Sequence, residues 1–206
     1  MLILGAKGHA KELLDLLDKQ NLLENIYFFD DQSQDGSAVL YENFPILKSI
    51  NEVNELFKTD TRFILGIGGV KPRQLLYERF HNIGGKPISV ISDTSTVGNY
   101  NVILGKGLNI MHNVAIFNDV SIGNGTLINS FASVHHDCRI GNFCEISPGA
   151  RILGRATIGD FSSIGSNAVI LPDVVIGENV VIGAGSVVTK HIPDNSTAIG
   201  VPAKLI

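Results

Sequence analysis

The second half of this chain carries an aliphatic residue at every sixth position. Fifteen consecutive positions follow this rule: Leu104, Ile110, Ile116, Ile122, Ile128, Val134, Ile140, Ile146, Ile152, Ile158, Ile164, Ile170, Ile176, Ile182 and Val188. An α-helix repeats its buried face every 3.6 residues and an ordinary strand every two, so neither element alone produces a period of six. The pattern therefore predicts a parallel β-helix built from hexapeptides.

Each hexapeptide of such a fold forms one short strand and one turn, and three hexapeptides close a coil of about 18 residues. The aliphatic side chain points into the coil, where it stacks on its counterparts above and below. A small residue often stands two positions earlier and is expected to point inward near a corner. No coil can bury its own core, so stability must come from the stacking of neighbouring coils. Residues one coil length apart then lie one above the other, at the strand spacing of roughly 4.8 Å.

Glycine follows many of the aliphatic positions directly. The glycines in this place are Gly105, Gly123, Gly141, Gly159, Gly165, Gly177 and Gly183. Because glycine adopts positive φ without steric cost, we expect it to serve turns that need such a backbone conformation.

The first part of the chain lacks the period of six and alternates between strand and helix patterns. Leu2-Ile3-Leu4, Ile26–Phe29 and residues 62–67 are expected strands, and Leu13 to Leu17, residues 51–57 and residues 72–83 are expected in helices. Such alternation predicts a small parallel βαβ unit of Rossmann-like type. We therefore expect an α/β domain at 1–92 and an all-β domain, the parallel β-helix with a C-terminal tail, at 93–206.

Two segments of the first domain have the composition of a ligand site. Gly5-Ala6-Lys7-Gly8-His9 follows the first strand and opens a helix, where free N–H groups favour a phosphate, although a tight structural turn would fit the same residues. Asp30-Asp31 follows the second strand, where acidic groups commonly bind ribose hydroxyls, although a solvated turn is the alternative. Both segments lie at the carboxyl ends of adjacent strands, the edge at which α/β sheets bind ligands.

The second domain carries one segment with the composition of a catalytic site, His135-His136-Asp137. Val134 points inward, so His136 and Asp137 fall in the outer turn, where a carboxylate can orient a histidine general base. Exposed polar turn residues are the alternative. Asn118 stands one coil length before His136 and Gly154 one coil length after it, so the same edge should carry an amide, a base and an unshielded backbone N–H. A base beside an open N–H donor is the minimum equipment for acyl transfer.

Composition excludes several classes of function. The formal net charge is −4 without any basic run, which argues against nucleic acid as a partner. The apolar runs are too short for a membrane span, and no leader-like segment precedes the first strand, so the expected location is cytoplasmic. Cys138 and Cys144 occupy the same inward slot of successive hexapeptides and are expected to be core thiols. The histidine spacing also lacks a pair one coil apart, so no metal is expected.

Short motifs along essentially the whole chain carry a family resemblance. They are Gly5-Ala6-Lys7-Gly8-His9, Phe29-Asp30-Asp31, Ile67-Gly68 with Arg73, His136-Asp137-Cys138-Arg139-Ile140-Gly141, Ser147-Pro148-Gly149-Ala150 and Gly200-Val201-Pro202-Ala203-Lys204. In these motifs the chain resembles bacterial hexapeptide-repeat acetyltransferases, and specifically the sugar O-acyltransferase group related to sialic acid O-acetyltransferases and UDP-4-amino-sugar N-acetyltransferases. The resemblance implies a nucleotide-sugar-binding first domain, a left-handed β-helix that binds acetyl-CoA as co-substrate, and a homotrimer with active sites between neighbouring prisms. Outward-facing apolar residues, for which Val174, Val175 and Leu171 are candidates, would suit such packing.

The resemblance also implies roles for individual residues. The residues that would line the sugar nucleotide are Lys7, Gly8, His9, Asp30, Asp31 and Gly68. His136 would be the general base and Asp137 would raise its basicity, and the residues that would contact acetyl-CoA are Glu145, Gly154, Ser166 and Ala184. Relatives commonly carry a histidine in place of Glu145, so this carboxylate would instead suit the ammonium group of an acceptor.

Together these observations favour an acetyl-CoA-dependent N-acetyltransferase that transfers acetyl directly to a nucleotide-linked amino sugar. A sugar O-acetyltransferase of the sialic acid type is the first alternative, and a non-catalytic β-helix scaffold is the second. The clustering of His136, Asp137 and Gly154 and the closing GVPAK segment argue against the scaffold.

Overall fold

The computed structural model describes residues 1–33 and 37–206. The chain forms two compact units. The front unit comprises Met1–Gly68 and Pro72–Ile88, and the second unit comprises Gly69–Lys71 and Ser89–Ile206. The units thus divide near Ile88, whereas the sequence predicted a domain boundary between residues 92 and 93; that boundary stays a prediction.

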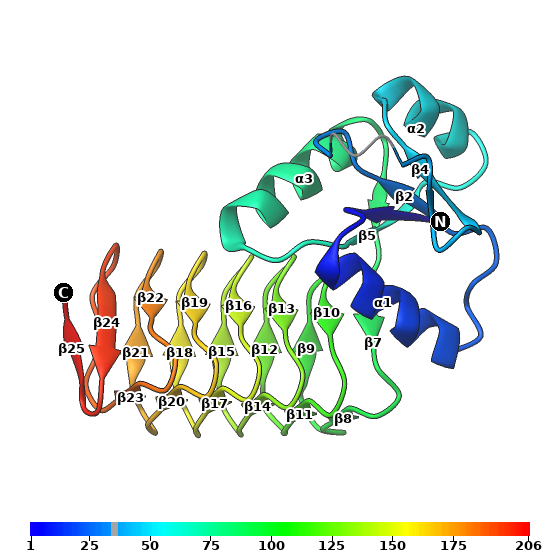
Figure 1. Cartoon of the computed structure of the whole chain (residues 1–206). Coiled ribbons are helices and arrows are strands. Elements are labelled where there is room, and N and C mark those ends of the chain that lie inside the picture. Colours follow the sequence, from blue (N-terminus) through cyan, green and yellow to red (C-terminus); the bar gives the residue numbers. More distant parts are fainter. Residues whose placement is uncertain (34–36) are drawn as a thin grey trace. The chain divides into compact units, whose positions relative to one another are not determined.

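The front unit is built on a sheet whose strands run in the order β3-β4-β2-β1-β5-β6 (Figure 1). Its strands are β1 (Leu2–Leu4), β2 (Tyr27–Phe29), β3 (Val39–Leu40), β4 (Phe44–Leu47), β5 (Arg62–Leu65) and β6 (Lys86–Pro87). Every pairing is parallel except that of β3 with β4. β1 is therefore central, and the loops that follow β1, β2 and β5 share one edge of the sheet.

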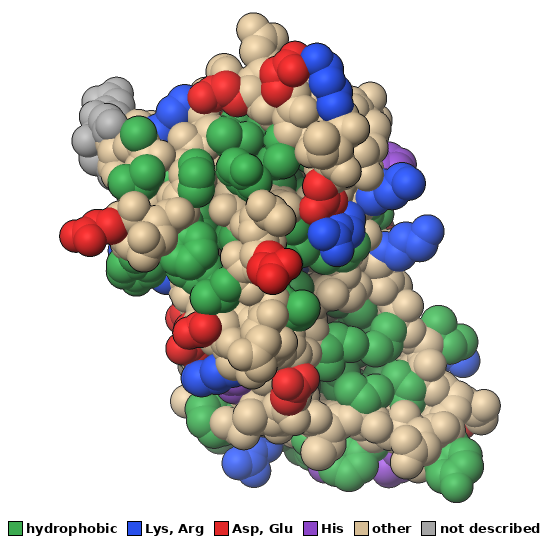
Figure 2. Space-filling view, turned by 90° about the vertical axis from the view of Figure 1, so that its right-hand side faces the viewer, with side chains coloured by type: hydrophobic (Ala, Val, Ile, Leu, Met, Phe, Trp, Pro, Cys, Tyr) green, Lys and Arg blue, Asp and Glu red, His purple; other side chains and the backbone are tan. Residues whose placement is uncertain are grey.

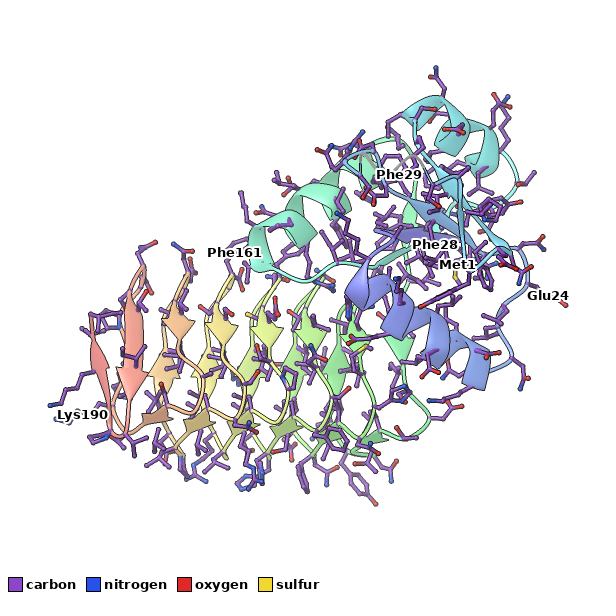
Figure 3. The ribbon with its side chains drawn as sticks, viewed as in Figure 1. Met1, Glu24, Phe28, Phe29, Phe161 and Lys190 are labelled. Carbon is purple, nitrogen blue, oxygen red and sulfur yellow. The ribbon has the colours of Figure 1, made fainter. Side chains whose placement is uncertain are left out.

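Three helices connect these strands, namely α1 (Gly8–Lys19), α2 (Ile50–Phe57) and α3 (Val70–Asn82). The leucines of α1 lie on its buried face, as their spacing predicted. A capping box starts α2, because the Ser49 side chain accepts from the Glu52 N–H while the Glu52 carboxylate accepts from the Ser49 N–H. The front core is aromatic: Phe29 packs edge-on against Phe80, with ring centroids 4.9 Å apart, and Figure 3 labels Phe29 on β2.

The predicted α/β character of the front unit is confirmed, with three strands that the sequence did not predict, namely β3, β4 and β6. β3 and β4 form an antiparallel hairpin at the edge of the sheet. Pro45 within β4 disguised it, because proline lacks the N–H that a strand donates to its neighbour and so argues against a strand in the sequence. The sequence placed only Leu13 to Leu17 of α1, which begins five residues earlier, and the other expected elements differ from the observed ones by no more than two residues at their ends.

The second unit is a parallel β-helix with three faces (Figure 1). The first face contains β7 (Val90–Ile91), β10 (Asn109–Ile110), β13 (Leu127–Ile128), β16 (Glu145–Ile146), β19 (Ser163–Ile164), β22 (Val181–Ile182), β24 (Thr197–Gly200) and β25 (Ala203–Leu205). The second face contains β8 (Thr96–Val97), β11 (Ala115–Ile116), β14 (Ser133–Val134), β17 (Arg151–Ile152), β20 (Val169–Ile170) and β23 (Val187–Val188). The third face contains β9 (Ile103–Leu104), β12 (Ser121–Ile122), β15 (Arg139–Ile140), β18 (Thr157–Ile158) and β21 (Val175–Ile176).

The predicted coil length, three hexapeptides, is confirmed by the strand register. Leu127 pairs with Glu145, and Glu145 pairs with Ser163. The register departs from this length only at the two ends of the β-helix. Val90 pairs with Asn109, one residue more than a coil, and Val181 pairs with Thr197, two residues fewer.

The aliphatic residues of the period, together with the small residues two positions earlier, form the continuous core of the β-helix. Cys138 and Cys144 belong to this core and are free thiols, as predicted. Burial raises the pKa of Cys138 to about 11 and that of Cys144 to about 12. The expectation that Val174 faces outward was wrong: it stands two positions before Ile176, so it fills the inward corner slot and is 4% exposed.

The expected role of glycine after the aliphatic positions was also wrong. Positive φ occurs instead two residues later, at residues such as Asp119, Asp137 and Arg155. Glycine after the aliphatic residue is needed for space: a Cβ built on Gly123 would lie 2.5 Å from the carbonyl carbon of Gly141 in the next coil. The coils therefore approach too closely at this point for any side chain.

Among the described residues, no helix combines the length and the apolar content needed to cross a lipid bilayer.

Candidate active site

The predicted catalytic residues lie on the edge between the second and third faces of the β-helix. Nδ1 of His136 lies 2.7 Å from Oδ2 of Asp137, and both side chains are about half exposed. Asp137 has a φ of 62°, and this left-handed conformation turns the chain so that its carboxylate faces the ring. The Asp137 carboxylate fixes the orientation of the imidazole through Nδ1, as a general base requires.

Gly154 lies beneath the His136 ring, as the coil length predicted. A Cβ built on Gly154 would lie 2.6 Å from Cε1 and 2.7 Å from Nε2 of His136. The N–H of Arg155 donates to the His136 carbonyl at 2.9 Å, which locks the two turns together. Within the described part of the chain, the Gly154 N–H has no hydrogen-bond acceptor. Because Gly154 has no side chain, the His136 ring can lie against it, with the Gly154 N–H beside the ring.

Asn118 occupies the same edge one coil before His136, also as predicted. Its backbone carbonyl accepts from the Asp137 N–H at 3.3 Å. Its side-chain amide is used within the fold, since Oδ1 accepts from the Tyr100 N–H at 3.2 Å. Asn118 therefore supports the turn that carries Asp137.

His135 differs in environment from its neighbour His136. Its ring stacks on Phe117, with centroids 4.9 Å apart. Burial, together with the nearby His136 and Arg151, lowers the pKa of His135. The neutral form of the His135 ring is therefore favoured beside His136. The sequence did not single out Phe117; its position one coil length before His135 could have revealed the stack.

The residues expected to contact acetyl-CoA are distributed over different parts of the β-helix. Ser166 and Ala184 stack on the edge between the first and second faces, where the Gly185 N–H donates to the Ser166 carbonyl at 2.8 Å. Glu145 begins β16 on the first face, with its side chain directed outward. Among these candidates, a single chain brings only Gly154 to the His136 edge.

In the front unit, the predicted glycines have different functions. Gly5 has a φ of 115°, and a Cβ there would lie 2.6 Å from Ile67, so the turn after β1 requires glycine. A Cβ on Gly8 would meet nothing within 4 Å. Gly8 opens α1, whose N-cap Lys7 makes no side-chain cap and whose first turn has no acidic residue. The N-terminal N–H groups of α1 thus remain a favourable place for an anion.

Two cavities adjoin this turn, and both are lined by Lys7 and Asp30. The smaller, of about 210 Å³, also contains Lys11 and Lys48. The larger, of about 380 Å³, is bounded mainly by apolar residues of α3 and by Asp31. The sequence did not predict Lys11 or Lys48, although Lys11 lies one helical turn after Lys7. His9 and Gly68 line neither cavity, and the His9 ring lies 3.2 Å from the Glu12 carboxylate.

Both predicted aspartates are ionised and held by their own loop. The Asp30 carboxylate accepts from the N–H groups of Gln32 and Ser33 and from the Ser33 hydroxyl. Burial opposes its ionisation, but these hydrogen bonds prevail and hold the pKa of Asp30 below its usual range. Burial likewise opposes ionisation of Asp31, while Gln32 and the Arg79 guanidinium at 2.8 Å lower its pKa. The loop therefore presents fixed negative charge beside the lysines.

The described residues contain no group of three His, Cys, Asp or Glu side chains that could hold a metal ion.

Comparisons with known proteins match both units. Residues 1–80 match the family model described as the PglD N-terminal domain, and residues 119–154 and 155–190 match the bacterial transferase hexapeptide model of six repeats. No curated protein sequence matches the chain significantly.

Solved structures match over the full chain. A variant of perosamine N-acetyltransferase from Caulobacter crescentus, in complex with CoA and GDP-perosamine, is 31% identical with a TM-score of 0.91, covering 100% of this chain and 95% of its own. The acetyltransferase domain of PglB from Neisseria gonorrhoeae, in complex with acetyl coenzyme A, is 30% identical with a TM-score of 0.91, covering 100% and 98%. WeeI from Acinetobacter baumannii is 28% identical with a TM-score of 0.90, with the same coverage.

The likeness covers 100% of this chain and so extends over both units. The repeats described above form the left-handed β-helix of these proteins. The protein therefore belongs to the bacterial hexapeptide-repeat transferases that carry a PglD N-terminal domain, and it is an acetyl-CoA-dependent acetyltransferase.

Proposed function

We propose that this protein transfers the acetyl group of acetyl-CoA to the amino group of a nucleotide-linked amino sugar, with His136 as the general base. The arrangement of His136, Asp137 and Gly154 carries this proposal. It offers a proton acceptor, a carboxylate that orients it, and a backbone N–H donor on one edge of the β-helix.

The reaction follows from this geometry. With the Nδ1 proton of His136 donated to Asp137, Nε2 has a lone pair available for a proton of the acceptor amine. The amine nitrogen attacks the thioester carbon and loses a proton to Nε2, the C–S bond breaks, and this proton passes from Nε2 to the sulfur so that CoA leaves as its thiol. Gly154 N–H donates to the carbonyl oxygen on which negative charge develops. Holding amine and thioester together supplies several kcal/mol of the required barrier reduction by proximity alone, about 7 kcal/mol in well-oriented model reactions.

The lysine-lined cavity supports a nucleotide-bearing acceptor. Lys7, Lys11 and Lys48 surround the N-terminus of α1, so a diphosphate would meet both ammonium groups and helix N–H donors. Asp30 and Asp31 provide the carboxylates for ribose hydroxyls. The Caulobacter relative was solved with GDP-perosamine, a nucleotide-linked amino sugar.

The distribution of the acetyl-CoA candidates supports a homotrimer. Ser166 and Ala184 occupy a different edge from His136 and Gly154 within one chain. In a trimer of prisms, one edge of each chain faces another edge of its neighbour, so both sets of residues would border one cleft. Exposed apolar side chains on the β-helix, such as Val175, would then gain packing partners. Figure 2 shows hydrophobic side chains reaching the surface.

A panel of acceptors tests the substrate class. Purified protein would receive acetyl-CoA together with UDP-, GDP- or dTDP-linked amino sugars or with free sialic acid, and CoA release would be followed with a thiol reagent. The buried Cys138 and Cys144 add little background because burial raises the pKa of both thiols. Turnover with a nucleotide amino sugar is expected. Turnover with sialic acid alone would establish O-acetylation, and silence across the panel would place the acceptor outside these classes and contradict the proposal.

Replacement of the base tests the mechanism. His136→Ala should lower kcat by about 10²–10⁴ with little change in KM, because general-base catalysis contributes that much to the chemical step. Asp137→Asn should produce a smaller loss, since the ring would keep its place but lose a charged partner. Melting temperatures would verify that both variants are folded. A near-normal kcat for His136→Ala would remove His136 from the mechanism.

A further inference from the structure

Glu145 makes a contact that its place in the sequence did not suggest. Oε2 of Glu145 accepts a hydrogen bond from the Gly69 N–H at 2.6 Å, across 76 residues of sequence. Gly69–Lys71 belong to the same compact unit as the β-helix. The carboxylate, which stands outward on β16, therefore has a partner within the protein.

The chemistry at Gly69 favours a carboxylate. Gly69 has a φ of 82° and directly precedes α3. The first N–H groups of a helix have no partners within the helix and carry partial positive charge. The first turn of α3 contains no acidic residue. Glu145 thus supplies from the β-helix the negative charge that this helix start lacks.

This contact competes with both roles expected for Glu145. A ligand group that drew the Glu145 carboxylate away from Gly69 would leave the Gly69 N–H without its acceptor, and unmaking a charge-assisted hydrogen bond is costly. The bond also acts on a loop that is held at its other end. The Arg73 guanidinium, fully buried, donates to the Ile67 carbonyl at 2.7 Å. Ile67 and Gly69 are therefore both fixed by charged side chains, with Gly68 between them.

We propose that Glu145 is a positioning residue for the nucleotide sugar, acting through the Ile67–Gly69 loop, and that it does not bind acetyl-CoA. This inference rests on the proposed function. Gly69, which is hydrogen-bonded to Glu145, lies in sequence between Ile67 and Pro72. Both Ile67 and Pro72 line the larger cavity of the front unit. Loss of the Glu145 carboxylate frees this loop and weakens binding of the nucleotide sugar.

Substrate-resolved kinetics test the proposal. Glu145→Ala should raise KM for the nucleotide amino sugar about tenfold, because the bond it removes is charge-assisted, while KM for acetyl-CoA stays within about twofold. Glu145→Gln retains an oxygen acceptor without the charge and should give an intermediate value. Calorimetric titration with the free nucleotide diphosphate should show the same order of affinities. Glu178→Ala, at an exposed glutamate of the β-helix, is the matched control and should leave both KM values unchanged.

Each other outcome overturns the proposal. A rise in KM for acetyl-CoA, alone or together with that for the nucleotide sugar, would show that Glu145 contacts the acetyl donor. Unchanged values in Glu145→Ala would show that the loop does not depend on it. If the wild-type protein turns over no nucleotide sugar, both the proposed function and this role of Glu145 are wrong. If the wild-type protein turns it over and the Glu145 variants have unchanged KM values, only the role of Glu145 is wrong. Glu145→Gln keeps the test valid if Glu145→Ala does not fold.

Discussion

At the scale of single residues, the site depends on a missing side chain as much as on those present. Gly154 has no left-handed φ that would demand glycine. Its lack of a Cβ instead makes room for the His136 ring, which lies within 2.7 Å of the Cβ position. The absence of a side chain at Gly154 thus determines where the His136 ring can lie.

Gly154→Ala should therefore lower activity without unfolding the protein. The new methyl group would displace the His136 ring, and misplacing a reacting group by about 1 Å can cost about 10²-fold in rate. Steady-state kinetics would measure kcat, with the melting temperature as the control for folding. In a His136→Ala background the substitution should have no further effect, because no ring remains to be displaced. An additional loss there would assign Gly154 a separate role.

Asp60 makes the front unit sensitive to acid. Its carboxylate binds Arg62 at 2.8 Å and the N-terminal ammonium of Met1 at 3.0 Å, and these groups depress its pKa far below the usual range. A carboxyl group whose pKa is lower in the folded state adds stability above its unfolded pKa, and this stability is lost as pH falls toward the folded value.

Asp60→Asn should therefore destabilise the protein by about 1–3 kcal/mol at pH 7, the contribution of hydrogen bonds to a charged group. Urea denaturation at pH 7 and at pH 3 would measure the free energy of unfolding. The difference between wild type and variant should shrink at pH 3, where the wild-type carboxyl loses part of its advantage. An equal difference at both pH values would contradict the assignment.

At the scale of elements, the coil is the unit of stability. Ile146 is fully buried and pairs in register with Ile128 above and Ile164 below. Truncation of the Ile146 side chain would leave a cavity bordered by three coils. Because each coil is held by its neighbours, none of them can move alone to fill this cavity.

Ile146→Ala should lower the free energy of unfolding by about 2–5 kcal/mol, the usual cost of such a truncation in a core. Ile103→Ala is the matched control: Ile103 also lies on a two-residue strand but is 69% exposed. We expect a loss below about 1 kcal/mol there. Guanidinium denaturation would compare the two, and similar losses would show that the coils do not share their core as described.

The sequence predicted these elements unequally, for physical reasons. A β-helix repeats one local rule, so fifteen aliphatic positions were enough to place His136 over Gly154. The contact between Glu145 and Gly69 joins a repeat to a segment outside it, and no periodicity relates the two. Positive φ was assigned to the wrong residues because composition alone does not distinguish a glycine needed for backbone freedom from one needed for space.

At the scale of the whole molecule, the distribution of candidate residues over separate edges makes oligomerisation a functional question. Light scattering with size exclusion should report three times the chain mass of 22.1 kDa. Placing a charge on the exposed Val175, as in Val175→Glu, should weaken assembly and reduce activity together if that face lies in the interface. An active monomer would show that one chain suffices for the reaction.

The constant coil length also turns sequence distance into direction. A residue lies on the same edge as His136 only when a whole number of coils separates the two in sequence. The number of residues between two positions therefore determines which edge or face of the prism each one occupies. One additional hexapeptide inserted between His136 and Gly154 would preserve the aliphatic period and the core, yet it would turn Gly154 to the next edge. Within this fold, a length change that is harmless to stability can separate His136 from the Gly154 N–H, so the proposed activity would constrain loop lengths that packing alone would tolerate.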